Sequence, residues 1–457
     1  MKKKFINKKE AKSFITKLGD EFAVVKNPVY IHPEFELYPL AKKINTADKL
    51  VAAVMDMDGT TTTTELLCIH SLEFMVRKFS GKIDTQTWKG LNPKEDYPHI
   101  IGNSTTKHVE YLITKYSKSF KKSEVIKSFL FAAAWTIIYG KDNQRKSEVV
   151  LNLKSFNCQD LINDDYFKKI INLTTLLDED KEQLSDYLFY KYKNNFSSFG
   201  FNDYVRLGID VYYQRYHEIL ERFRLGESKF IADELFGDPN KHLIEAMPGI
   251  PVMLPMIKGL ITEHHDLFFD YILKAFEHKS GKAFSLTNME KARKNFIKLC
   301  QNFQVSPIKT AIVTSSIFYE ADIVLREVFK VISNELNNLL PDSDFKRNLL
   351  QKFSDYNFYY DTVVTANDSS EIRLKPHRDL YSIALFKLNI PKENFDKVIG
   401  FEDSESGTIA IRAAGIGLSI AVPFAETSGH NLKAAAYVCK GGLPEVILKY
   451  NMFVNSK

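Results

Sequence analysis

Five short apolar runs rich in valine and isoleucine stand out along the chain. They cover residues 51–56, 309–316, 361–366, 397–404 and 416–423. Continuous apolar character is typical of strands that are buried on both faces, as in parallel sheets. Segments with helical periodicity separate the later runs, for example 378–389 and 406–415. This alternation predicts the α/β fold class, with a doubly wound parallel sheet and right-handed crossovers.

A long helical stretch interrupts this pattern after the first run. Some 250 residues separate the first two runs, far more than a crossover needs. Their apolar residues recur every three or four positions, as in amphipathic helices. We therefore expect a large inserted α-helical cap at 65–245, and a sheet core made from 51–64 and 246–450. Smaller helical elaborations are expected within that core, at about 260–300 and 325–357. Residues 1–50 form an N-terminal extension to which the pattern assigns no role.

The composition is that of a globular protein with a large core. Of 457 residues, 44% are apolar and 26% are charged, and the net charge of +5 is small for this length. Lysine clusters carry no interleaved aromatic platform, so they indicate solvated helix faces and no nucleic-acid partner. The four cysteines are far apart, which favours reduced thiols over a disulfide framework or a zinc site. With no apolar run long enough to cross a bilayer and no signal peptide expected, we predict a cytoplasmic protein without a membrane partner.

Chemically capable side chains follow four of the five predicted strands. The first strand ends in Asp56 and Asp58, and the second in Thr314, Ser315 and Ser316; Lys375 follows the third, and the fourth delivers Glu402 and Asp403. In an open α/β sheet the carboxyl ends of the strands form the ligand crevice, so these groups are expected to meet there. Like charges repel, so clustered acids imply a cation among them. Without histidine or cysteine nearby, Mg²⁺ is favoured over zinc.

This set of groups suits phosphoryl transfer. A carboxylate nucleophile, Mg²⁺, a hydroxyl group and a lysine can bring one anion to attack another, because the cations offset the negative charge. The second aspartate can protonate the leaving oxygen and later accept a proton from water. Each group also has a plainer interpretation: Asp56 and Asp58 as an exposed turn, the Thr314 cluster and Glu402-Asp403 as helix caps, and Lys375 as a surface lysine.

The motifs DMDGT, TSS, LKP and GFEDSESG occur in that order at 56–60, 314–316, 374–376 and 400–407. In this the chain resembles the haloacid dehalogenase (HAD) superfamily of Mg²⁺-dependent phosphohydrolases. The sequence EDSESGTIAIRAAG resembles that of the β-phosphoglucomutase and phosphoglycolate phosphatase branch of this superfamily. That branch carries a helical cap after the first motif, and here the cap is enlarged. The cap segment 100–113 is similar to one that reaches the substrate in relatives, with Gly102 and Ser104 matching.

The resemblance implies a role for each motif residue. Asp56 would be the nucleophile that becomes aspartyl-phosphate and also a metal ligand. Asp58 would be the general acid/base and bind the metal through its backbone carbonyl, and its presence favours phosphate chemistry over dehalogenation. Thr314 and Lys375 would hold the phosphoryl group. Glu402 and Asp403 would complete the metal site, the former directly or through water. Further phosphate contacts are implied at Met57, Gly59 and Ser315.

These observations predict a Mg²⁺-dependent phosphatase that hydrolyses a small phosphorylated metabolite. One alternative is a phosphosugar mutase of the β-phosphoglucomutase type, in which the aspartyl-phosphate returns its group to another hydroxyl. Against it, Thr105 stands where the mutase has a phosphate-gripping arginine. The other alternative is a binding or regulatory protein that uses the enlarged cap. The substrate, the oligomeric state and the purpose of the cap are not encoded in these motifs.

Overall fold

The computed structural model describes residues 5–27, 32–82, 88–100, 105–164, 166, 178–368, 373–424, 427 and 429–455. The chain divides into two compact units. The first unit combines residues 1–63 with 244–457, and the second is formed by residues 64–243.

A six-stranded, fully parallel sheet forms the centre of the first unit. Its spatial order is β10-β9-β8-β3-β6-β7. The strands are β3 (Ala52–Asp56), β6 (Lys309–Val313), β7 (Thr362–Val364), β8 (Val398–Glu402), β9 (Leu418–Ala421) and β10 (Tyr437–Val438). The central strand β3 is buried throughout because it lies between β6 and β8. The predicted α/β fold class is therefore confirmed, and among the six strands of this sheet the two-residue edge strand β10 is the one not predicted.

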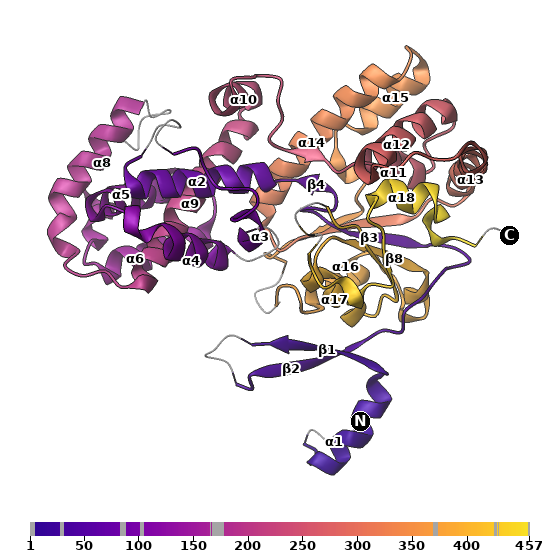
Figure 1. The fold of residues 1–457 in the computed structure, drawn as a ribbon, viewed down its shortest axis with the longest axis horizontal. Helices are drawn as coiled ribbons and strands as arrows, with labels where there is room; N and C mark the ends of the chain where they lie inside the picture. The colour runs from indigo at the N-terminus through magenta and orange to yellow at the C-terminus, as the bar shows by residue number, and fades with distance from the viewer. Residues whose placement is uncertain are drawn as a thin grey trace. The chain divides into compact units, whose positions relative to one another are not determined.

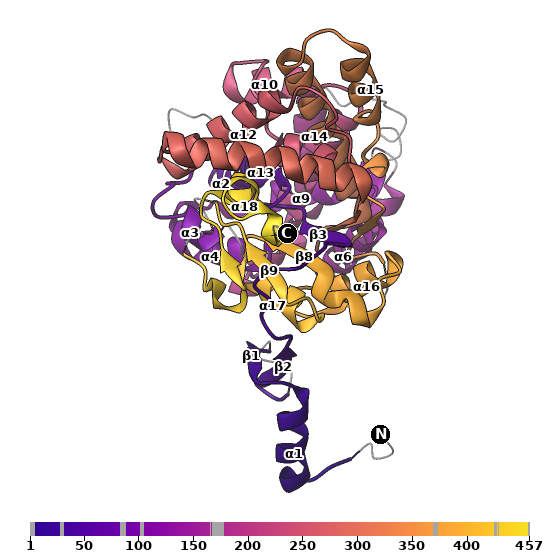
Figure 2. The same cartoon turned by 90° about the vertical axis from the view of Figure 1, so that its right-hand side faces the viewer.

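Helices cover both faces of this sheet (Figures 1 and 2). One face carries α16 (Asp379–Lys387) and α17 (Glu405–Ala413), whose apolar side chains join those of β3, β6, β7 and β8 in one core. On the other face lie α11 (Ile250–Ile257), α12 (His265–Ser280), α13 (Leu286–Val305) and α18 (Gly442–Leu448). The helices α14 (Phe318–Leu339) and α15 (Asp344–Lys352) follow β6. Helices α12 and α13 lie in the stretch predicted as an elaboration at about 260–300, and α14 and α15 overlap the one predicted at about 325–357.

The second unit is helical. Its described helices are α2 (Glu65–Ser80), α3 (Tyr97–Ile100), α4 (Thr105–Tyr116), α5 (Lys122–Tyr139), α6 (Asn143–Ser155), α8 (Asp178–Tyr192), α9 (Phe201–Arg224) and α10 (Ser228–Phe236). The long helix α9 packs against α2, α4 and α5. Buried apolar residues such as Leu72, Phe129, Leu207 and Ile219 form its core. Within the described residues, no helix combines the length and apolar character needed to cross a lipid bilayer.

The N-terminal residues form a helix and a hairpin. Helix α1 (Lys8–Leu18) begins with a capping box between Asn7 and Glu10. Strands β1 (Glu21–Lys26) and β2 (Phe35–Leu40) pair antiparallel. The chain then runs along the edge of the core, where the Ile44 amide donates to the Gly417 carbonyl at 3.1 Å and the Val51 amide to the Lys397 carbonyl at 2.9 Å. Residues 41–51 thus lead directly into the central strand.

Candidate active site

Asp56 is the last residue of the central strand, and the turn after it is held by its own backbone. Asp56 is only 6% exposed, although its side chain is a carboxyl group that can carry a charge. The Thr61 and Thr62 amides donate to the Met57 carbonyl at 2.9 and 2.8 Å, and the Thr61 hydroxyl donates to the Asp56 carbonyl at 2.6 Å. The run of threonines that follows the DMDGT motif therefore fixes the direction in which both aspartates leave the strand.

Gly59 allows this turn to pass close to the neighbouring acid. Its φ of +79° lies in the region that favours glycine. A Cβ placed there would lie 2.7 Å from Asp403 Oδ2 and 2.6 Å from the Phe424 ring. The Gly59 amide itself donates to the Thr62 carbonyl at 2.8 Å. Phosphate binding by this amide stays a prediction and would require that bond to open.

Lys375 lies between two carboxylates. Its Nζ forms an ion pair with Asp56, lies 2.6 Å from Glu402 Oε1 and donates to the Val313 carbonyl at 3.2 Å. The lysine side chain is only 9% exposed. Burial alone would lower the pKa of Lys375, but the charges of Asp56 and Glu402 outweigh it and raise that pKa above its usual value. The lysine is therefore a fixed positive charge at the end of β3.

Asp56, Glu402 and Asp403 form a buried acidic cluster. One oxygen of each lies within 4.8 Å of the others. Burial and the negative charge of Glu402 raise the pKa of Asp403 to about 8, and the same two causes raise the pKa of Asp56. When all three carboxylates are ionised, they and Lys375 together carry a net charge of −2. Because these donors are hard oxygens in a buried site, the cluster fits a divalent cation such as Mg²⁺.

Two hydroxyl groups hold the Glu402 carboxylate. The Tyr381 hydroxyl donates to Oε1 at 2.7 Å and the Ser404 hydroxyl to Oε2 at 3.1 Å. Oε1 also contacts Lys375, whereas Oε2 keeps a second lone pair, so both direct ligation of a metal and contact through water fit Glu402. Tyr381 lies on α16 and was not singled out from the sequence, since its helix looked like ordinary apolar packing. Only the register of α16 against β8 reveals its role.

The Thr314 cluster lies beside Asp58. The Thr314 and Ser316 hydroxyls lie 3.4 and 3.5 Å from Asp58 Oδ2, and the Ser316 amide donates to the Thr314 hydroxyl oxygen at 3.0 Å. Asp58 is half-buried, whereas Thr314 is buried. These contacts aim the Asp58 carboxylate toward β6, while Asp56 faces Lys375. The two aspartates therefore occupy different surroundings, as two different chemical roles would require.

The structure brings together the predicted residues Asp56, Lys375, Glu402 and Asp403, and separately Asp58 with Thr314. Met57 and Ser315 are chain neighbours of these residues, and phosphate binding at these two positions stays a prediction. Gly102 and Ser104 of the cap segment lie outside the described residues. Thr105 begins α4, and its hydroxyl lies 3.3 Å from that of Tyr213 in the helical unit.

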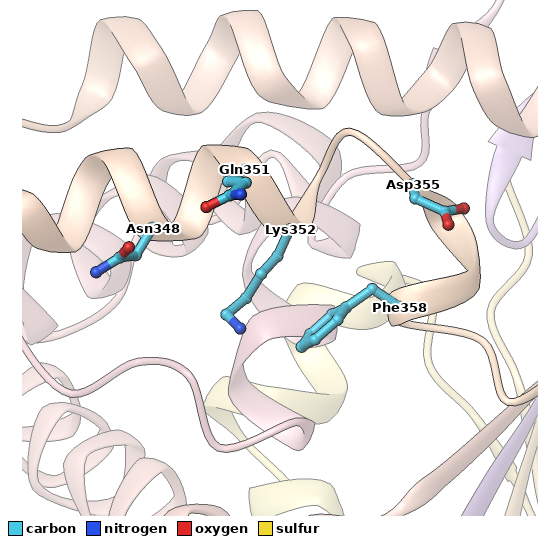
Figure 3. A pocket seen from close by; sticks show the side chains of 5 residues that line it. All are labelled: Asn348, Gln351, Lys352, Asp355 and Phe358. Atoms are coloured by element: carbon cyan, nitrogen blue, oxygen red, sulfur yellow. The ribbon is translucent and has the colours of Figure 1, made fainter.

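A separate hollow of about 540 Å³ lies beside α15 (Figure 3). Asn348, Gln351, Lys352, Asp355 and Phe358 line it. Lys352 Nζ lies 4.2 Å from the centroid of the Phe358 ring. This hollow contains none of the motif residues and no cluster of acids, so we assign the chemistry to the buried cluster at the end of β3 instead.

No protein-family model and no curated protein sequence matches this chain. Among solved structures it is similar to CbbY from Rhodobacter sphaeroides in complex with phosphate, at 14% identity over 87% of this chain and 96% of that one, with a TM-score of 0.33. It is also similar to a putative β-phosphoglucomutase from Thermotoga maritima, at 17% identity over 89% and 100% of the two chains, with a TM-score of 0.34.

A third similar structure is a putative phosphoglycolate phosphatase from Lactobacillus delbrueckii subsp. bulgaricus, at 14% identity over 88% of this chain and 99% of that one, with a TM-score of 0.33. This is a similarity of fold. Identities and TM-scores this low carry no information on the reaction, which has to be inferred from the residues of the site.

Proposed function

We propose that this protein is a Mg²⁺-dependent phosphatase that hydrolyses a small phosphorylated metabolite through an aspartyl-phosphate. One observation carries the proposal: Asp56 lies at the end of the central strand, paired with Lys375 and within 4.8 Å of two further buried acids. A buried excess of negative charge beside a fixed lysine serves no packing purpose, because desolvating several carboxylates is unfavourable. It does suit a site that receives a cation and a phosphoryl group.

In the first step a carboxylate oxygen of Asp56 attacks phosphorus, and the bond from phosphorus to the ester oxygen breaks. Lys375 would turn from Asp56 to a phosphoryl oxygen while keeping its contact with Glu402, which frees Asp56 to react. A bound Mg²⁺, held by Asp56, Asp403 and the backbone carbonyl of Asp58, with Glu402 contacting it directly or through water, would supply positive charge next to the phosphoryl oxygens. The Thr314 hydroxyl would donate a hydrogen bond to the phosphoryl group.

Asp58 handles the proton in both steps. Protonated, it would give its proton to the departing ester oxygen. Ionised, it would then take a proton from the water that attacks phosphorus, so that inorganic phosphate leaves and Asp56 is regenerated. The half-buried position of Asp58 suits this exchange, since the group has to contact the substrate oxygen and then water.

Hydrolysis of p-nitrophenyl phosphate tests the proposal. The full-length protein should release phosphate with Mg²⁺, lose this activity with EDTA, and lose it in Asp56→Asn. Asp344→Asn provides the matched control, since it removes one aspartate charge from the exposed start of α15. Asp58→Asn should accumulate phosphorylated Asp56, detectable by hydroxylamine trapping, because p-nitrophenolate can leave without a proton from Asp58, whereas water is no longer activated.

Equal rates in the wild type, with EDTA and in Asp56→Asn would refute the phosphatase. A panel of phosphorylated metabolites would then identify the substrate class. Isomer formation from a phosphosugar, dependent on a bisphosphate, would replace the phosphatase with the mutase. Absence of turnover together with protein capture that survives Asp56→Asn would favour the regulatory alternative.

A further inference from the structure

The N-terminal hairpin has one exposed apolar face and one face that contacts the core. Val24 and Leu37 are cross-strand partners and are 63% and 55% exposed. On the opposite face, Ala23 pairs with Tyr38 and Glu21 with Leu40, and both Ala23 and Leu40 are 8% exposed. Since side chains alternate along a strand, the face with Tyr38 is the one turned to the sheet domain. The residues on that face are the ones that contact the loop around Lys375.

Tyr38 is joined to His377, two residues after Lys375. The Tyr38 oxygen lies 2.6 Å from His377 Nδ1, and the Tyr38 hydroxyl donates to Glu36 Oε2 at 2.8 Å. Burial lowers the pKa of His377 and raises the pKa of Tyr38 to about 12, so both groups are neutral near pH 7. A neutral ring with its proton on Nδ1 donates to Tyr38, which leaves the phenol proton for Glu36. Every donor in this chain of hydrogen bonds is then satisfied.

The same hairpin also contacts the residues that precede Lys375 in its loop. Arg373, two residues before Lys375, lies 3.7 Å from Glu36 Oε2. The Asn27 amide group donates to Glu36 Oε1 at 3.2 Å, which keeps Glu36 in place on the hairpin. Contacts two residues before and two residues after Lys375 therefore connect its loop to one small antiparallel sheet.

The base of the hairpin is anchored to the helix that follows the acidic cluster. Arg412 of α17 is 1% exposed, and it donates to the Ala41 carbonyl through Nε at 2.8 Å and to the Ala434 carbonyl through Nη1 at 2.9 Å. The same guanidinium pairs with Glu21. The hairpin thus spans from α17, which begins two residues after Asp403, to the loop that carries Lys375.

We propose that this hairpin positions the active-site lysine: Tyr38 holds His377 and thereby keeps Lys375 Nζ between Asp56 and Glu402. Tyr38 is a positioning residue, because it acts through the loop and touches neither acid. The inference rests on the proposed function for its catalytic consequence, since the position of Lys375 matters only if Lys375 serves the reaction. It gives strands β1 and β2 a purpose that their sequence does not reveal.

Tyr38→Phe tests this inference without changing volume. It removes the hydrogen bond with His377 and the one to Glu36. Loss of the bond with His377 should lower kcat for p-nitrophenyl phosphate about fivefold, with KM changed less than twofold. Amides of residues 373–385 should exchange with deuterium about fivefold faster in the metal-free protein. The control is Tyr271→Phe, which removes a comparable hydroxyl whose 2.7 Å bond goes to Glu335, far along the chain from these loops. It should change neither quantity.

His377 offers a second pair of variants. His377→Ala should reproduce the effects of Tyr38→Phe, and His377→Asn should restore much of kcat and of the slow exchange, because its amide can donate near the position of Nδ1. Unchanged kcat and unchanged exchange in Tyr38→Phe and His377→Ala would overturn the inference. Faster exchange with unchanged kcat would also overturn it, because the hairpin would then serve structure alone. If the wild type hydrolyses no phosphate ester, the proposed function fails, while the exchange rates still decide whether the hairpin holds the loop.

Discussion

Replacing Gly407 with alanine would add a methyl group where the neighbouring carboxylate leaves no room. Gly407 lies in the first turn of α17, and an ideal Cβ there would lie 1.8–2.0 Å from the carboxyl atoms of Glu402, whereas ordinary contact begins at 3.4 Å. The carboxylate would have to move by about 1.5 Å to relieve this overlap. Because Glu402 is buried, it cannot simply turn into solvent.

That movement would break the contacts that hold Glu402. The bonds from Tyr381 at 2.7 Å and Lys375 at 2.6 Å cannot survive such a shift. An unsatisfied buried acceptor destabilises by about 1–3 kcal/mol, and overpacking adds about 1–3 kcal/mol. Within a helix, alanine stabilises the folded state by about 1 kcal/mol relative to glycine. The effects combine to a net loss of about 1–5 kcal/mol in the free energy of unfolding, opposite in sign to what helix propensity alone predicts.

The measurement has to report on the sheet domain itself. Both tryptophans, Trp88 and Trp135, belong to the helical unit, so their fluorescence would follow the wrong part of the chain. Deuterium exchange of the β8 amides against urea concentration reports on the sheet instead. Gly429→Ala is the control, since no atom of the described residues lies within 4 Å of a Cβ there. If Gly407→Ala were as stable as this control and kept its kcat, the close approach of α17 would not be what fixes Glu402.

Three other perturbations give further expectations. Lys375→Met should destabilise the metal-free protein by about 3–5 kcal/mol, because it leaves buried carboxylates unpaired, and excess Mg²⁺ should restore more stability than it does in the wild type; thermal unfolding with EDTA and with Mg²⁺ compares them. Mg²⁺ affinity should fall as pH drops through the Asp403 pKa of about 8, because ligation requires the ionised carboxylate; calorimetry in buffers of different ionisation enthalpy should detect proton release, and pH-independent affinity would contradict it. Burial raises the pKa of Asp210 from 3.8 to about 6, so the native state binds its proton more tightly than the unfolded state does, and stability present below pH 4 should be lost, by about 3 kcal/mol, as pH rises through 6. Asp210→Asn should flatten this slope in urea unfolding of the helical unit, and an unchanged slope would rule out Asp210 as its source.

Much of the sheet could be predicted because parallel strands that are buried on both faces have continuous apolar sequences. The five predicted runs contain β3, β6, β7, β8 and β9, with ends that differ by a few residues. Strand β10 was missed because two residues at a sheet edge leave no periodic pattern. The hairpin was missed for a different reason: EFAVVK and FELYPL are short, and the partners of their buried face lie more than 300 residues away.

The acidic residues of the site could be found because each directly follows a strand, and strand ends of a parallel sheet converge by geometry alone. Tyr381 and Gly407 could not, because their importance depends on how α16 and α17 lie against Glu402. A tyrosine in an apolar helix and a glycine in a helix start have ordinary explanations until their neighbours are known. The sequence thus locates groups on the ends of elements more readily than groups that act from the side of a helix.

The central place of β3 has a consequence for the order in which the chain can fold. Both of its neighbours, β6 and β8, lie more than 250 residues further along. During synthesis β3 emerges early and stays unpaired, whereas residues 64–243 form a contiguous unit that can fold as soon as they leave the ribosome. Until β6 and β8 have been synthesised, the apolar strand β3 is unpaired and can take part in aggregation. Expression of this protein should therefore depend on translation speed and on chaperones that shield β3 until β6 arrives.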